Sequence, residues 1–151
     1  MQAETERFVA ELVAAWNSHD ARRVARFYAD CYEGSDIGQV APMRGPDEVC
    51  DYFERFYAAF PDVQLTVDSV VHETERFAIA WTAHGTHRGK LMNIPPSGKA
   101  VAVRGVSMLT TEAGKVVRAL TVWDMAGGVV GEGAGAPRFS LRGGPRSAPP
   151  R

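Results

Sequence analysis

Apolar residues at helical spacing predict three helices in the first part of the chain. The first covers Glu4 to Asn17, where apolar side chains recur on one face. Asp20 can cap a second, short helix that runs to about Tyr28. A third begins at Gly45-Pro46-Asp47-Glu48, where proline stands in the first turn and two acids favour the positive end of the helix dipole. It is expected to end at Pro61.

The remaining pattern predicts a sheet. A weak strand pattern covers Cys31 to Ile37, and Gln39 to Arg44 is expected to be a loop. Val63 to His72 alternates between apolar and polar residues, as a half-buried strand does. Three further strands are expected over Phe77–His87, Ala100–Thr111 and Val116–Met125. Helices that are segregated from a mostly antiparallel sheet indicate the α+β class.

The third helix is unusually rich in large apolar residues. Six of them recur at helical spacing: Val49, Tyr52, Phe53, Phe56, Tyr57 and Phe60. Such a row could line a ligand site. Packing of the helix against a sheet is the favoured interpretation, because every amphipathic helix needs an apolar face for that purpose.

Composition changes sharply towards the end of the chain. The 151 residues are 45% hydrophobic, which suits one globular domain, and we assign it to residues 1–126. Residues 127–151 are dominated by Gly, Ala, Pro, Ser and Arg. Such a segment has too little apolar surface to offset the entropy lost on ordering, so we expect a disordered tail.

Charge and cysteine content restrict the partners. The net charge is -1 and the pI about 6.4, which makes nucleic acid a poor candidate. No apolar run approaches the ~18 residues that would span a membrane, and the acidic N-terminal residues do not resemble a signal peptide. Two cysteines, Cys31 and Cys50, make no disulfide framework. A cytoplasmic protein with reduced thiols is therefore expected.

Several short motifs, taken in order along the chain, carry a resemblance to a known family. They are Ala15-Trp16-Asn17, Gly45-Pro46-Asp47-Glu48, Phe60-Pro61-Asp62, His84-Gly85-Thr86-His87-Arg88-Gly89, Ile94-Pro95-Pro96-Ser97-Gly98-Lys99, Val103-Arg104-Gly105-Val106, Gly114-Lys115-Val116 and Asp124. Together they resemble the SnoaL-like polyketide cyclase family of the nuclear-transport-factor-like superfamily. The resemblance implies an α+β cone in which a curved, mostly antiparallel sheet wraps a long helix around a hydrophobic pocket. It also implies cofactor-independent acid–base chemistry on a small hydrophobic, polyketide-like molecule, and commonly a homodimer or homotetramer.

The chain departs from this family at the two positions that matter most for chemistry. In the well-studied cyclases an aspartate on the last strand is the general acid/base, and a histidine on the preceding strand supports it. Those positions fall on Thr121 and Ser107 here. Neither is a base near neutral pH without an activating partner, so the aldol-type mechanism does not carry over.

Two residues are the candidates for catalysis. His87 is in phase with Trp81 along its strand, and neutral imidazole is the natural acid/base near pH 7. Its structural alternative is a strand-end histidine bonded to a loop carbonyl. Asp124 follows Trp123, and a carboxylate held in a closed pocket could act as a general acid. Its alternative role is to seal the sheet by binding backbone N–H groups or Arg104.

The candidates for substrate binding are six further residues, of which Tyr32 and Asp36 could instead be a packed aromatic and an exposed loop acid. Ser107 and Thr121 could hydrogen-bond to a carbonyl or hydroxyl group of the ligand. Tyr32 could donate to an enolate, and Asp36 could be the base that the last strand lacks. Trp81 and Trp123 complete the set. The sequence contains no metal-ligand cluster, phosphate loop or dinucleotide motif, so we expect neither a metal nor a cofactor.

The leading functional hypothesis is a small pocket enzyme that performs cyclisation, isomerisation or dehydration by proton transfer. A cofactor-free monooxygenase and a non-catalytic binding or assembly module are the alternatives. The outer face of the sheet is expected to carry apolar residues at Val106, Met108, Leu120 and Val122. Exposed apolar surface of this kind marks interfaces, which predicts a homodimer packed sheet to sheet.

Overall fold

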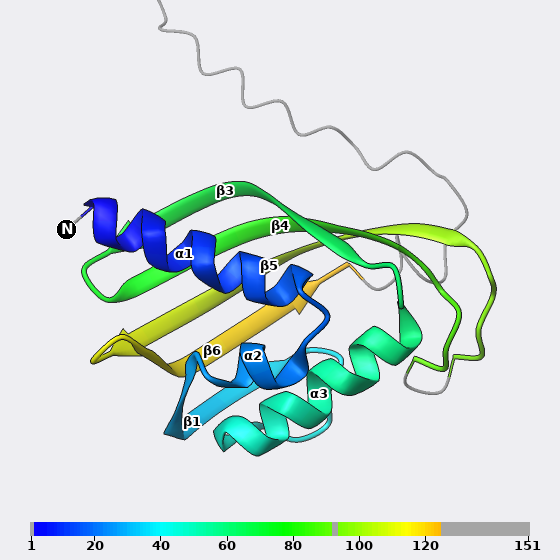
Figure 1. Ribbon diagram of the computed structural model, residues 1–151, viewed down its shortest axis with the longest axis horizontal. Helices are drawn as coiled ribbons and strands as arrows, with labels where there is room; N and C mark the ends of the chain where they lie inside the picture. Colours follow the sequence, from blue (N-terminus) through cyan, green and yellow to red (C-terminus); the bar gives the residue numbers. More distant parts are fainter. Residues whose placement is uncertain (1, 92–93, 125–151) are drawn as a thin grey trace, which may run out of the picture.

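The computed structural model describes residues 2–91 and 94–124. The predicted tail at 127–151 lies outside this range. Two helices, two strands and a third helix come first, and four long strands follow (Figure 1). The elements are α1 Gln2–Asn17, α2 Ala21–Ala25, β1 Tyr28–Asp36, β2 Met43–Arg44, α3 Gly45–Ala59, β3 Gln64–Glu73, β4 Arg76–Thr86, β5 Ala100–Glu112 and β6 Lys115–Trp123.

The strands form one six-stranded sheet in the order β2-β1-β6-β5-β4-β3. Strands β3 to β6 pair with their chain neighbours in antiparallel fashion, and β1 pairs in parallel with β6. The predicted α+β class is confirmed. The expectation of loop throughout Gln39 to Arg44 is wrong at its end, because Met43 and Arg44 pair with β1 as strand β2. Two residues are too few to show an alternating pattern.

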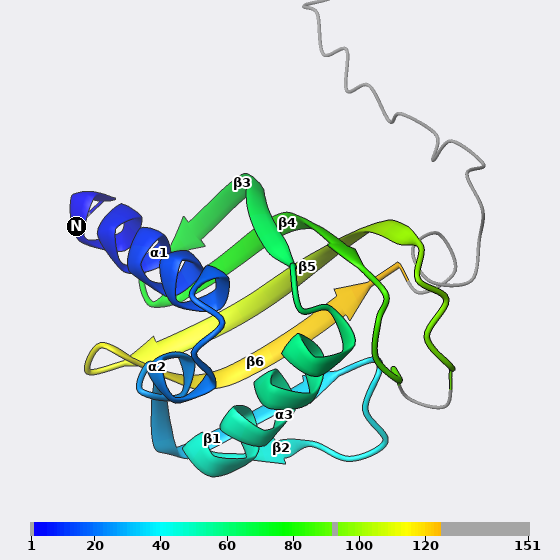
Figure 2. The same ribbon diagram turned by 45° about the vertical axis from the view of Figure 1, so that its right-hand side comes forward.

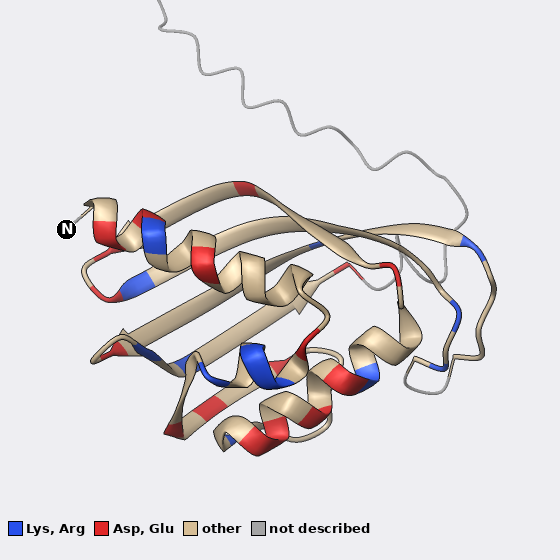
Figure 3. Ribbon diagram, viewed as in Figure 1, with Lys and Arg blue, Asp and Glu red and all other residues tan. Residues whose placement is uncertain are grey.

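The helices lie on one side of the curved sheet. In Figures 1 and 2, α1 crosses β3 and β4, and α3 lies below it beside β1. Charged residues cluster on the helices and at the strand ends, while the middle of the sheet is nearly free of them (Figure 3). The most deeply buried core side chains include Leu12, Val24, Ile79 and Val116. In the part of the chain that the structure describes, no helix is long and apolar enough to cross a membrane.

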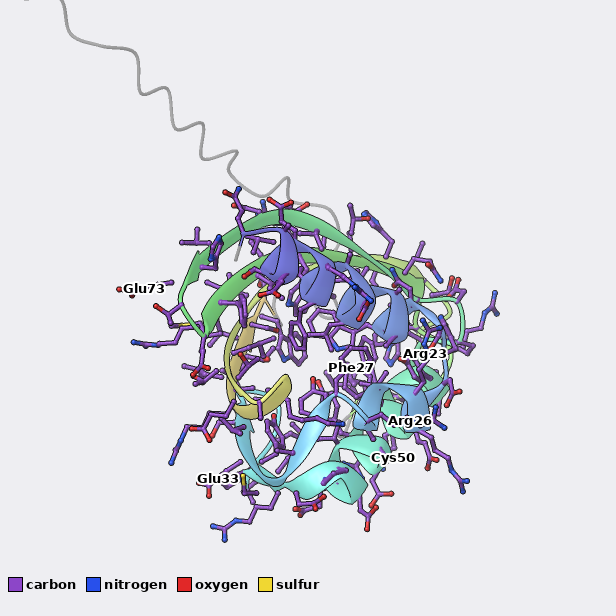
Figure 4. The ribbon with its side chains drawn as sticks, turned by 60° about the vertical axis from the view of Figure 1, so that its left-hand side comes forward. Arg23, Arg26, Phe27, Glu33, Cys50 and Glu73 are labelled. Atoms are coloured by element: carbon purple, nitrogen blue, oxygen red, sulfur yellow. The ribbon has the colours of Figure 1, made fainter. Side chains whose placement is uncertain are left out.

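The second helix is shorter than predicted. Asp20 caps it as expected, since its Oδ1 accepts a hydrogen bond from the Arg23 amide at 3.0 Å. The helix stops at Ala25, and Tyr28 begins β1 instead. The reason is sheet pairing: the carbonyl of Phe27 accepts the Val116 amide at 2.8 Å, so the backbone already follows β6. The Phe27 side chain points to the interior, whereas Glu33 and Glu73 point outward (Figure 4).

Side-chain hydrogen bonds hold the helical layer against the sheet. The Asn17 side-chain amide donates to the Leu65 carbonyl at 2.9 Å and accepts from the Leu65 amide at 2.7 Å. The Tyr57 hydroxyl donates to the Trp16 carbonyl at 2.7 Å. These bonds join α1 to both β3 and α3, so the space between α3 and the sheet has a defined width.

The end of α3 is tied to the end of β4. The Ala59 carbonyl accepts hydrogen bonds from the Arg88 and Gly89 amides at 2.9 and 3.1 Å. The Asp62 carboxylate accepts the Thr86 amide and hydroxyl, each at 2.7 Å. These Thr86 hydrogen bonds lower the pKa of Asp62 below its ordinary value of 3.8, the backbone N–H contributing most.

This carboxylate should make stability depend on pH in the acid range. Its depressed pKa contributes stability above the unfolded-state value of 3.8, which is lost as pH falls through the folded-state pKa. We expect the free energy of unfolding of the wild type to fall more steeply below that pH than that of Asp62→Asn. Urea denaturation at a series of pH values measures this. Asp30→Asn, which changes an exposed acid of β1, is the control and should leave the slope unchanged.

Candidate active site

A cavity of about 1150 Å³ lies between α3 and the inner face of the sheet. Aromatic and aliphatic side chains supply most of its wall, and a few polar groups converge there. Helix α3 contributes Tyr52, Phe53 and Phe56, and the sheet contributes Tyr32, Asp36, Trp81, Ser107, Thr121 and Trp123. Concave, mainly apolar sites with a few placed polar groups are typical of small-molecule binding.

The aromatic row of α3 has two roles, of which the sequence favoured only one. Tyr57 and Phe60 are buried in the core. Tyr52, Phe53 and Phe56 are only half-buried and form one wall of the cavity. The interpretation of this row as packing alone is therefore incomplete. Helical spacing places all six residues on one broad face, but it does not show how far the sheet stands from that face.

Two glycines make room for aromatic rings in the wall. A Cβ at Gly105 would lie 2.4 Å from Cζ2 of Trp81, and the two residues are paired across β4 and β5. A Cβ at Gly34 would lie 1.8 Å from the Tyr32 hydroxyl. Each ring therefore lies over a position without a side chain. The sequence shows these glycines, but it does not show which rings cover them.

Asp36 is a buried carboxylate of this wall. It ends β1, is only 6% exposed, and is paired with Thr121 of β6 in the parallel register. Its Oδ1 accepts hydrogen bonds from the Trp123 indole N–H at 2.9 Å and the Gly38 amide at 2.7 Å. Its Oδ2 accepts the Tyr52 hydroxyl at 2.9 Å. A carboxylate has about four acceptor positions, so Oδ2 keeps one for a ligand.

Two tyrosines beside Asp36 are held in their protonated form. Burial raises the pKa of Tyr52 well above its ordinary value, and the charge and hydrogen bond of Asp36 raise it further. Burial likewise raises the pKa of Tyr32, with smaller contributions from Tyr28 and Asp36. Both phenols therefore remain hydrogen-bond donors near neutral pH. The hydroxyl of Tyr52 donates to Asp36, and that of Tyr32 is available for a ligand.

A second polar group crosses three strands. The indole N–H of Trp81 donates to Ser107 Oγ at 3.0 Å. Ser107 Oγ lies 3.0 Å from Thr121 Oγ1, and either hydroxyl can be the donor. The two hydroxyls face each other because β5 and β6 pair Ser107 with Thr121. Trp81, Ser107 and Thr121 thus form a continuous hydrogen-bonded chain along the cavity wall.

The two residues predicted to be catalytic do not line this cavity. His87 is fully buried, with its ring 5.4 Å from that of Phe60, and among the described residues neither ring nitrogen has a hydrogen-bond partner. Asp124 is exposed, and its amide donates to the Arg104 carbonyl at 2.9 Å. Strand alternation explains the second placement: Trp123 faces the cavity, so its neighbour faces away. Asp124 therefore lies outside the cavity wall that the described residues form.

Replacing His87 distinguishes burial from catalysis. We expect His87→Leu to keep the free energy of unfolding or raise it by about 1 kcal/mol, because an apolar group replaces a buried polar ring that has no hydrogen-bond partner among the described residues. Thermal unfolding measures this. The rate of any reaction that takes place in the cavity should stay at the wild-type level. A loss of about 10²–10⁴-fold with the fold intact would instead make His87 the acid/base.

Comparisons with known proteins agree with this geometry. The family model of the SnoaL-like polyketide cyclases matches residues 6–129. AclR from Streptomyces galilaeus, a proposed hydroxylase, is 31% identical over 84% of this chain and 79% of its own, with a TM-score of 0.73.

Two further structures share the fold at lower identity. TsrD from Streptomyces laurentii is 23% identical over 84% of this chain and 92% of its own, with a TM-score of 0.75. IdmH from Streptomyces antibioticus, a proposed polyketide cyclase, is 24% identical over 81% and 93%, with a TM-score of 0.69. Comparison with curated protein sequences gives no significant match.

Proposed function

The chain belongs to the SnoaL-like polyketide cyclase family, and on this premise we propose that it is an enzyme that moves a proton on a polyketide-like molecule bound in the cavity. The observation that carries this proposal is the placement of Asp36. Its carboxylate stands in the cavity wall beside Thr121, the position at which the resemblance expects the acid/base. We therefore assign the role of base to Asp36, ahead of His87 and Asp124.

The proposed step is removal of a proton from a carbon next to a ligand carbonyl. The C–H bond breaks, the proton passes to Oδ2 of Asp36, and the electron pair moves to the carbonyl oxygen as an enolate. Tyr32 can donate a hydrogen bond to that oxygen, since burial keeps its hydroxyl protonated. Asp36 then returns the proton to another atom. Cyclisation, isomerisation and dehydration can all begin in this way, and the step needs no cofactor.

A simple ketone tests the step without knowledge of the natural substrate. We expect the protein to accelerate exchange of the α-hydrogens of 2-tetralone, a bicyclic ketone with a fused benzene ring, for deuterium in D₂O. Nuclear magnetic resonance follows the loss of the α-hydrogen signals. Binding of 2-tetralone without accelerated exchange would favour the non-catalytic binding module instead.

A hydroxylase is the second candidate, because AclR at 31% identity is described as one. It would consume dioxygen together with a reduced aromatic ligand that supplies the electrons. An oxygen electrode with 1,4-naphthohydroquinone as that ligand distinguishes the two functions. Uptake that exceeds autoxidation, with no exchange of 2-tetralone, would favour the hydroxylase.

We also expect a homodimer. The outer face of the sheet exposes Met108 (47%), Leu120 (45%) and Val122 (42%), next to Val106. A second copy of the same face would cover them. Sedimentation should give twice the 16.4 kDa of one chain. The double variant Met108→Lys/Leu120→Lys should sediment as a monomer. The control Val40→Lys changes an exposed loop residue and should still sediment as a dimer. A monomeric wild type would contradict the proposal.

The free thiols of Cys31 and Cys50 fit a reducing compartment, and we propose the cytoplasm.

A further inference from the structure

The hydrogen-bonded series Trp81–Ser107–Thr121 has one more donor hydrogen than it has hydrogen bonds. The indole N–H and the two hydroxyls supply three hydrogens, and the two hydrogen bonds of the chain use two of them. One hydroxyl proton is therefore left over, whichever hydroxyl donates to the other. Among the described residues, neither Ser107 nor Thr121 has a further hydrogen-bond partner.

The surplus proton belongs to a hydroxyl that lines the cavity, since both Ser107 and Thr121 do so. Ser107 is only 5% exposed, and Thr121 is half-buried. An enclosed ligand excludes water from these groups, and a buried donor without an acceptor is costly. Spare lone pairs on the two oxygens carry a smaller penalty, because under-satisfied acceptors are less rare than orphaned donors in proteins. The ligand must therefore offer an acceptor.

We propose that Trp81, Ser107 and Thr121 form a hydrogen-bond donor site for a carbonyl oxygen of the ligand. The inference rests on the proposed function, because the same carbonyl would place its α-carbon before Asp36, beside Thr121. At this position the family's usual acid/base pair is replaced by a neutral donor that binds the oxygen. The site selects ketones and quinones over hydrocarbons of the same shape.

Trp81 is a positioning residue of this donor site. Its ring lies over Gly105, which fixes the direction of the N–H towards Ser107. The N–H occupies one lone pair of Ser107 Oγ and polarises its hydroxyl. Hydrogen bonds in such a chain strengthen one another, so the terminal hydroxyl becomes a better donor than an isolated one.

A matched pair of ligands tests the donor site directly. Anthraquinone-2-sulfonate and anthracene-2-sulfonate share three fused rings and the same charge, and they differ in two carbonyl oxygens. We expect calorimetry to show tighter binding of the quinone to the wild type. In Ser107→Ala/Thr121→Val the ratio of the two affinities should fall by about 3- to 10-fold, the value of one ordinary hydrogen bond. Each single variant keeps one hydroxyl and should lose less.

Two control variants separate the hydroxyls from packing. Thr121→Ser keeps both hydroxyl groups and should keep the wild-type ratio. Thr82→Val removes a hydroxyl on the exposed side of β4, where it donates to Asp68 at 2.7 Å, and should also leave the ratio unchanged. The infrared C=O band of the bound quinone gives a readout that altered packing would not imitate. It should shift to lower frequency in the wild type, by less in Trp81→Phe, and least in the double variant, which keeps the Tyr32 hydroxyl as a donor.

An unchanged affinity ratio in the double variant would overturn the donor site. Equal affinity of the wild type for the two ligands, or binding of neither, would overturn it as well. These outcomes are independent of catalysis by Asp36. Loss of 2-tetralone exchange in Asp36→Asn together with an unchanged ratio would leave the proposed function standing and refute only the donor site.

Discussion

Asp36→Asn should lower the rate of α-hydrogen exchange in 2-tetralone by about 10²–10⁴-fold, the range for loss of a positioned acid/base. The amide has nearly the same shape, and its oxygen can still accept from Trp123 and Gly38. Its NH₂ group would face the Tyr52 hydroxyl, which can turn and accept instead of donating. The fold should therefore survive, and the lost activity would reflect the missing base.

The matched control is Asp124→Asn, which removes the other carboxylate near the end of β6. Asp124 is exposed and does not line the cavity, so the exchange rate should stay at the wild-type level. Circular dichroism and thermal unfolding confirm that both variants are folded. Full exchange activity in Asp36→Asn would refute the assignment of the base. A large loss in Asp124→Asn alone would transfer the role to that residue.

Gly105→Ala should cause a large loss of stability. A Cβ there would lie 2.4 and 2.6 Å from two carbons of the Trp81 ring and 2.8 Å from the Val122 carbonyl oxygen. The carbonyl belongs to a paired strand, so the indole must move, and its hydrogen bond to Ser107 breaks. Overpacking of this kind typically costs about 1–3 kcal/mol in the free energy of unfolding.

Urea denaturation measures this effect, with Gly85→Ala as the control. A Cβ at Gly85 would meet its nearest neighbours at 3.3–3.4 Å, so the free energy of unfolding should change much less. Gly105→Ala should also lower the preference for the quinone over the hydrocarbon, because Trp81 no longer holds Ser107. A stable Gly105→Ala protein with wild-type ligand preference would mean that the ring adjusts without consequence.

Local patterns in the sequence were sufficient to predict the class of the fold and most of its elements. The cap at Asp20, the first-turn proline Pro46 and the alternation in β3 to β6 are local features, and the structure has helices and strands at these positions. These predictions succeeded because they depend on neighbours along the chain. The inward placement of Ser107 and Thr121 came from the resemblance to the family, and both line the cavity together with Trp81.

The position of a residue relative to the cavity could not be predicted in this way. Alternation along the strand would place His87 on the same face as Trp81. However, β4 ends at Thr86 and the chain then joins the end of α3, so the His87 ring packs against Phe60. The sequence pattern does not single out Asp36 as a wall residue, because β1 has a weak strand pattern with glycine at position 34. That glycine accommodates Tyr32, a contact that only the folded chain contains. The alternation of side chains shows on which face of a sheet a residue lies, and the cavity occupies only part of that face.

The parallel pairing of β1 with β6 has a consequence for how such proteins diverge. Asp36 of β1 and Thr121 of β6 are paired, although the two strands come from opposite ends of the domain's sequence. Either strand can therefore supply a carboxylate to the same region of the cavity wall. An acid/base could thus relocate from one strand to the other through a chain that carries both. A sequence alignment would then show the acid/base of β6 as missing and suggest an inactive protein, although a carboxylate from β1 still faced the ligand.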